Sequence, residues 1–215
     1  MNPSSRTDHL YAPTKTRIEA LSDNVFSIAM TLLILELKVP EVPASSADAE
    51  LPWGLFELWP KLQSYVISFA SLGFFWLNHH FQFHFIRRTN VVILLLNFLI
   101  LLHIAFLPFS TALLGDYPHS RVGVITYGGN LTVLSLLMLL HWRYITTHSG
   151  LVDPDLDAHL IRSVSRRSFA VLCIFALAIG VAFVSAETST FIYVISVLSL
   201  LLTVGVHRKG GHRLS

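Results

Sequence analysis

The sequence predicts an all-α membrane protein with six transmembrane helices per subunit. Of its 215 residues, 53% are hydrophobic and only 13% are charged, and the mean hydropathy is +0.61. A water-soluble domain of this length needs a larger polar surface to cover its core. The hydrophobic residues are also gathered into runs of about 20, which is the length of a helix that crosses a bilayer. We therefore expect a single integral membrane domain over residues 1–215.

Six such runs follow one another along the chain. The predicted spans are Glu19–Val39, Lys61–Phe81, Val91–Leu114, Val122–Trp142, Ser168–Ala186 and Ser189–His207.

The connecting segments agree with these spans. Residues 41–60, between the first two runs, are rich in Pro, Ala, Ser and acids, and the third run ends at the turn signal Asp116-Tyr117-Pro118. The polar residues 146–168 precede the fifth run. That run contains Cys173, the single cysteine, which can form no disulfide within the chain. We expect both connecting segments, 41–60 and 146–168, to be loops.

The distribution of basic residues predicts the orientation. If the N-terminus is cytoplasmic, only Lys38, Lys61 and Arg121 of the 15 Lys and Arg residues lie on the outer side. Cytoplasmic loops carry an excess of Lys and Arg. We therefore expect both termini in the cytoplasm, with a short N-terminal segment at residues 1–16 and a C-terminal tail at residues 208–215.

The first run carries polar residues within its apolar sequence. Ser22, Asp23, Asn24 and Thr31 all lie in it. An ionisable side chain in hydrocarbon costs about 3 kcal/mol even on insertion scales, so an acid in a spanning helix suggests a function by default. The simpler explanation is that Asp23 and its neighbours cap the helix near the lipid headgroups.

One face of the first helix is made of branched apolar residues. Ile28, Leu32 and Leu35 have the spacing i, i+4 and i+7, with Asn24 and Thr31 close to the same face and Asp23 on nearly the opposite one. Lipid contact or core packing explains most stripes of this kind. A narrow ring of such residues from several subunits also gates ions by dewetting.

A second polar group ends the second run, in the sequence WLNHHFQFH. Asn78, His79 and His80 are consecutive there, and His84 follows. Membrane di-iron enzymes need many histidines in several boxes, whereas the remaining histidines of this chain are scattered singly, so we predict no metal site. We expect instead that His79 or His80 hydrogen-bonds or ion-pairs with Asp23 at the same membrane depth.

The sequence contains no signature of an enzyme or of a cofactor site. A Gly-rich phosphate loop, a GxSxG elbow and paired acids at a catalytic spacing are all missing from it. The potassium-filter sequence TVGYG is missing as well, so a cation channel built from this chain has to select ions by another device.

Three motifs resemble the transmembrane protein 175 family of potassium channels in its prokaryotic, single-repeat form. The run Arg17-x-x-x-Leu21-Ser22-Asp23 is similar to the R-x-x-x-F-S-D signature of its first helix, although Leu21 replaces an aromatic residue. The second helix ends in Phe75-Trp76-Leu77-Asn78-His79-His80, as in the family. The third ends in a sequence, LPFSTALLG at residues 107–115, that is also similar to the family's.

The resemblance implies a six-helix subunit without a pore loop, assembled as a homotetramer around an axis that the first helix lines. It implies a hydrophobic constriction at Ile28, Leu32 and Leu35, with Thr31 and Asn24 near the conduction path. It also implies a polar network behind the pore, formed by the following residues: Arg17, Ser22, Asp23, Asn78, His79 and His80.

The function expected from the resemblance is passive conduction of potassium and related monovalent cations across a bacterial-type plasma membrane. No prosthetic group is expected, and K⁺ is the permeant ion. The main alternative is a proton-coupled transporter or a proton-permeable pathway that uses Asp23 with His79 or His80 as a relay, since buried acids and histidines also mark proton paths. A membrane scaffold without transport remains a third interpretation.

Overall fold

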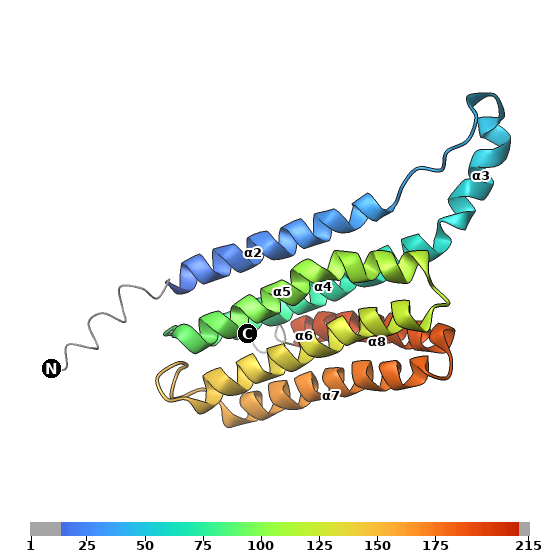
Figure 1. The fold of residues 1–215 in the computed structure, drawn as a ribbon. Coiled ribbons are helices and arrows are strands. Elements are labelled where there is room, and N and C mark those ends of the chain that lie inside the picture. Colours follow the sequence, from blue (N-terminus) through green and yellow to red (C-terminus); the bar gives the residue numbers. More distant parts are fainter. Residues whose placement is uncertain (1–13, 211–215) are drawn as a thin grey trace.

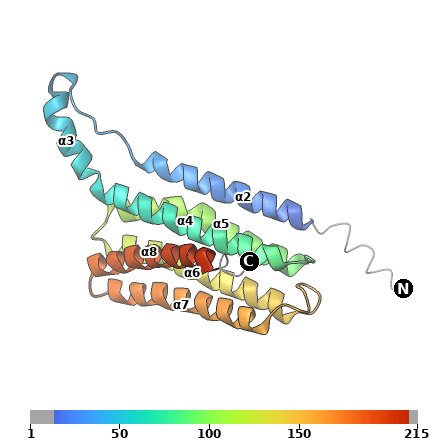
Figure 2. The same ribbon diagram turned by 180° about the vertical axis from the view of Figure 1, so that it is seen from behind.

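Six long helices form the protein in the computed structural model, which describes residues 14–210 (Figures 1 and 2). They are α2 (Lys15–Leu32), α4 (Trp59–Phe85), α5 (Val91–Asp116), α6 (Arg121–Thr147), α7 (Ala158–Ala182) and α8 (Ala186–Gly210). Three shorter elements lie between α2 and α4: the 3₁₀ helices η1 (Leu33–Glu36) and η2 (Ala44–Ser46), and the α-helix α3 (Ala47–Glu57).

The long helices have the dimensions of membrane spans. Helices α4 to α8 contain 25 to 27 residues each. At about 1.5 Å per residue they exceed the hydrocarbon thickness of about 30 Å. Four segments within the described residues are both long and apolar enough to cross a membrane: α2 with η1, α5, α6 and α7. The chain is therefore an integral membrane protein by its helices.

Each predicted span coincides with one helix, but several boundaries were wrong. Helix α7 begins at Ala158 and not at Ser168, because the Asp157 side chain caps it by accepting a hydrogen bond from the His159 backbone N–H at 2.8 Å. The supposed loop over residues 41–60 contains η2 and α3.

The two ends of the chain differ from the prediction in a similar way. The backbone of α8 stays helical to Gly210, so the expected tail at 208–215 starts inside a helix. Helix α2 starts at Lys15, within the expected N-terminal segment 1–16. The remainder of both segments, residues 1–13 and 211–215, lies outside the described residues.

One apolar core joins all six long helices. Buried members from successive helices are Phe26, Leu72, Ile104, Leu131, Phe175 and Tyr193. Helix α6 packs against α5 and α7, while α2, within residues 14–210, contacts only α4, α5 and its own continuation η1 (Figures 1 and 2). Helix α2 thus lies at the edge of the bundle, with one side turned away from the other helices.

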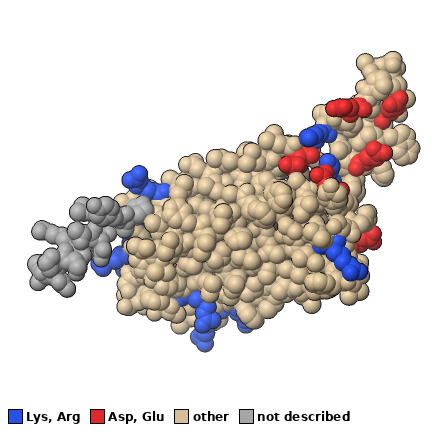
Figure 3. Space-filling view, in the orientation of Figure 1, with Lys and Arg blue, Asp and Glu red and all other residues tan. Residues whose placement is uncertain are grey.

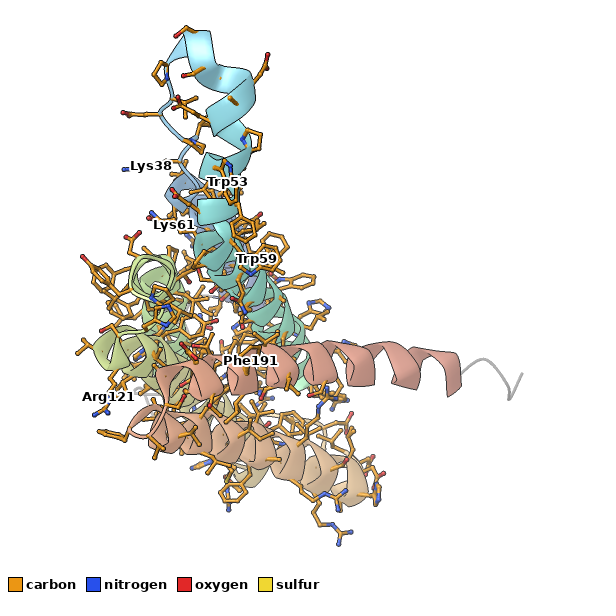
Figure 4. All side chains as sticks on the ribbon, turned by 90° about the vertical axis from the view of Figure 1, so that its right-hand side faces the viewer. Lys38, Trp53, Trp59, Lys61, Arg121 and Phe191 are labelled. Atoms are coloured by element: carbon orange, nitrogen blue, oxygen red, sulfur yellow. The ribbon has the colours of Figure 1, made fainter. Side chains whose placement is uncertain are left out.

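The two ends of the bundle differ in their charged residues. In the view of Figure 3 the visible Asp and Glu residues gather at the end that carries α3. Lys38, Lys61 and Arg121, the three basic residues predicted to lie outside, are all at this end, as are the exposed Trp53 and Trp59 (Figure 4). Tryptophan and lysine are typical of a membrane–water interface, so this end has the composition of the predicted outer side.

Candidate functional site

The outward face of α2 is apolar and uncovered in a single subunit. Ile28 is 57% exposed, Leu32 42% and Leu35 65%, whereas Phe26, Ala29 and Leu33 on the other side of the helix are buried. Asn24 and Thr31 are exposed beside the stripe. The structure therefore brings together, on one face, the residues that the helical period selected as a stripe.

The geometry of this face changes at its end. The α-helix stops at Leu32 and continues as the 3₁₀ turn η1, so the prediction of a regular helix to Val39 was wrong. A 3₁₀ helix has three residues per turn, so residues three apart point in the same direction. Leu32 and Leu35 have that spacing, and both remain exposed. The Thr31 hydroxyl donates to the Ile28 carbonyl oxygen at 2.9 Å, and its oxygen keeps its capacity to accept.

A chain of buried polar groups holds the opposite side of α2 to the bundle. Ser22 Oγ donates to the Ile18 carbonyl oxygen at 2.8 Å and accepts from Asn97 Nδ2 of α5 at 3.1 Å. His79 Nε2 of α4 lies 2.8 Å from Asn97 Oδ1. Because a carbonyl oxygen only accepts, Nε2 carries the proton and donates it. The Asn97 amide thereby joins three helices: α2 through Ser22, its own helix α5, and α4 through His79.

Asp23 has a different partner from the one expected. Its Oδ1 accepts a hydrogen bond from Trp76 Nε1 of α4 at 2.9 Å. His79 bonds to Asn97, and His80 instead stacks on the Trp76 indole, with ring centroids 5.8 Å apart and planes 23° apart. The prediction that His79 or His80 bonds to Asp23 was therefore wrong. The sequence indicates the depth of a residue in the membrane, but not which side of α4 it occupies.

Two members of the expected network lie outside it. Arg17 is exposed, and it takes part in none of the hydrogen bonds that link α2 to α4 and α5. Asn78 is half-buried and lines a pocket between α4, α6 and α7. Two series of side-chain contacts therefore link α2 to the bundle. One connects Ser22, Asn97 and His79, and the other connects Asp23, Trp76 and His80.

Sequence reasoning missed several buried polar residues. Asn97 is the centre of the first chain, and His141 Nδ1 lies 2.7 Å from Gln82 Oε1 in a second buried pair. His103 and Asn130 form a third, with His103 Nδ1 2.7 Å from Asn130 Oδ1. Each is a polar side chain inside a long apolar run, a signal that was available and points to an interhelical partner.

No group of three or more His, Cys, Asp or Glu residues that could hold a metal ion occurs within residues 14–210. The histidines of α4 point to separate partners, namely Asn97 for His79, Trp76 for His80 and Phe85 for His84.

These features define a class of protein: a multi-helix integral membrane protein whose first described helix is fastened to its bundle by polar contacts and leaves an apolar face that no other described residue covers. Comparison with known proteins identifies the family. The family model described as "Endosomal/lysosomal potassium channel TMEM175" matches residues 17–108. This range includes the whole outward face of α2 and both polar chains.

Relatives extend the match over most of the chain. A potassium channel of Streptomyces collinus is 37% identical over 179 residues, which are 79% of this chain and 83% of that protein. The chain therefore belongs to the TMEM175 family, which is a family of channels and not of enzymes.

A solved structure and a vertebrate relative complete the comparison. The crystal structure of a lysosomal potassium-selective channel TMEM175 homolog from Chamaesiphon minutus has a TM-score of 0.78 and 31% identity, and the match covers 88% of this chain and 97% of that one. The mouse endosomal/lysosomal proton channel TMEM175 is 34% identical over 122 residues, which are 53% of this chain but only 24% of the mouse protein.

Proposed function

We propose that this protein is a potassium-permeable cation channel that conducts passively through a pore lined by α2 from four copies of the chain. Ions move down their electrochemical gradient, without covalent chemistry or a prosthetic group. K⁺ is the permeant ion, as the names of the bacterial relative and of the solved homolog suggest. No pore loop is needed in this arrangement.

The observation that carries the proposal is the uncovered face of α2. A single subunit leaves Ile28, Leu32 and Leu35 exposed on a segment that packs against only α4 and α5 among the long helices of the described residues. When four such faces meet around an axis, their branched side chains form rings that narrow the path and exclude water when closed. Thr31 and Asn24, beside these rings, offer oxygen atoms to a partly dehydrated cation.

The polar contacts behind α2 act as support in this proposal. Ser22 and Asp23 fasten the helix through Asn97 and Trp76, so the apolar face keeps one orientation relative to the axis. Arg17 lies at the cytoplasmic mouth, where its exposed guanidinium faces the aqueous entrance. All six long helices cross the membrane, with both termini in the cytoplasm, and the membrane is a bacterial-type plasma membrane.

Substitutions on the proposed constriction test this function. Ile28→Asn and Leu32→Asn place an amide in the ring, which wets it, so both variants should raise K⁺ leak into liposomes severalfold. Leu177→Asn is the matched control, because Leu177 is also exposed but lies on α7, which packs against α6 and α8 and not against α2 in the described residues. Unchanged leak in both α2 variants, or an equal rise in the control, would refute the pore assignment.

A second candidate is a proton-permeable or proton-coupled pathway. The mouse relative is named a proton channel, and His79 is buried in a hydrogen-bonded chain close to Asp23. Asp23→Asn separates the candidates, because an amide oxygen still accepts from Trp76 but the side chain no longer carries a proton. Retained K⁺ flux in this variant favours the channel. Loss of flux from a protein that still assembles favours the relay.

A further inference from the structure

A pocket of about 570 Å³ opens between α4, α6 and α7. Its walls are the second half of α4, the first half of α7, and Ser135 and Met138 of α6. Helix α4 starts beside α3 and runs to the opposite end of the bundle, which we call the basic end. Helix α7 starts at that basic end (Figure 1). The pocket therefore lies in the half of the bundle that the proposed orientation places in the cytoplasmic leaflet.

The lining of the pocket changes from apolar to polar along its length. Phe74 and Phe75 of α4 and Val171 of α7 lie at the deep end, toward the middle of the helices. His84 of α4 and Ser163 of α7 lie nearer the basic end, with Arg167 one turn deeper than Ser163. An amphiphile has the same polarity, with an apolar tail and a polar head.

The basic residues in the lining favour an anionic headgroup. The lining residues include Arg167, His80 and His84, and none of them is an Asp or a Glu. A guanidinium matches the geometry of phosphate oxygens and forms charge-assisted hydrogen bonds with them. Basic pockets between transmembrane helices on the cytoplasmic side bind anionic lipid headgroups.

We propose that this pocket binds one anionic phospholipid per subunit. Its phosphate contacts Arg167 and His84, and one acyl chain lies along Phe74, Phe75 and Val171. The choice of leaflet rests on the orientation given under the proposed function, whereas the binding itself does not depend on conduction.

The site is connected to the pore helix through two side chains. His80 lines the pocket and stacks on Trp76, and Trp76 donates its indole hydrogen to Asp23 of α2. A bound headgroup that fixes His80 also fixes Trp76, and with it the contact that orients α2. Occupancy of the pocket therefore changes the K⁺ flux, and this change should be absent in variants that no longer bind the lipid.

The test compares lipids that have identical acyl chains on the purified full-length protein, by native mass spectrometry. Phosphatidylglycerol should be retained at one molecule per subunit in preference to phosphatidylcholine. Arg167→Gln should weaken this retention about tenfold, the effect of losing one charge-assisted hydrogen bond. The control is Arg166→Gln, since Arg166 is exposed on the same helix, has the same charge and does not line the pocket.

A second variant keeps the charge and removes the space. Ser168→Phe places a ring in the pocket and should displace phosphatidylglycerol even if Arg167→Gln folds poorly. Equal retention of the two lipids would overturn the proposal, as would equal weakening by Arg166→Gln and Arg167→Gln. Displacement by millimolar inorganic phosphate alone would identify a site for free phosphate and overturn the lipid assignment.

Flux measurements keep this proposal separate from the proposed function. In liposomes with and without phosphatidylglycerol, the native protein should differ in K⁺ flux and Arg167→Gln should not. Absent lipid binding with intact flux would remove only the lipid site. Selective binding by a protein without K⁺ flux would remove only the channel.

Discussion

Replacing Asn97 with leucine tests how α2 is held against the bundle. Leucine is close to asparagine in size, so the change removes two hydrogen bonds with little change in volume. The N–H of His79 Nε2 then loses its acceptor at a buried position, while Ser22 keeps its bond to the Ile18 carbonyl oxygen. An unsatisfied buried donor costs about 1–3 kcal/mol. Interhelical hydrogen bonds within membranes are worth about 0.6–2 kcal/mol.

We therefore expect Asn97→Leu to lower the free energy of unfolding by about 1–2 kcal/mol, measured by thermal denaturation in detergent. The matched control is Asn130→Leu, which removes a similar amide pair with His103 between α5 and α6 without contacting α2. Both variants should lose stability, but only Asn97→Leu should change K⁺ flux. Equal effects of the two variants on flux would contradict a role of the Asn97 hydrogen bonds in orienting α2.

Three further predictions follow from particular contacts. Gly128→Ala should destabilise the protein by about 1–3 kcal/mol, because a Cβ there would lie 1.8 Å from Tyr193 Oη. Gly129→Ala has open space around its Cβ and should instead stabilise the helix by about 0.5–1 kcal/mol in the same denaturation assay. A Gly129→Ala variant less stable than Gly128→Ala would contradict the packing of α8 on α6. Trp76→Phe keeps the aromatic surface but removes the bond to Asp23, so it should alter K⁺ flux in liposomes more than Trp53→Phe at an exposed position of α3; identical fluxes would exclude a role for that bond. Leu35→Asn, at the end of the 3₁₀ turn, should raise leak as Ile28→Asn does, and an unchanged leak would place the constriction within α2 alone.

The number and order of the long helices could be predicted because a bilayer sets the length of an apolar run. The ends of the helices could not, since hydropathy measures the part of a helix in hydrocarbon and not its extension into the headgroups. Helix α7 illustrates this: its first turns carry Arg162 and Arg166 and are polar, yet Asp157 caps them. Likewise α3 is short and lies outside the apolar runs, so span length contained no information about it.

The helical period of α2 predicts that Ile28 and Leu32 share one face, and in the structure both are exposed. The period alone left open whether that face is buried or exposed. The partner of Asp23 could not, because membrane depth leaves several side chains of α4 as candidates and only packing decides among them. Trp76 lies about one helical turn before His79 on α4. The prediction therefore identified the right part of α4 but chose the wrong side chain within it. Asn97, alone among apolar neighbours on α5, was the clearest overlooked signal.

The most direct test of passive conduction is K⁺ flux from liposomes that contain the purified protein, measured against K⁺ and Na⁺ gradients with and without a proton ionophore. A passive channel moves K⁺ quickly down its gradient without a proton gradient, and Ile28→Asn should leak more. Flux that occurs only when protons can move in exchange would contradict passive conduction and favour the proton-coupled alternative.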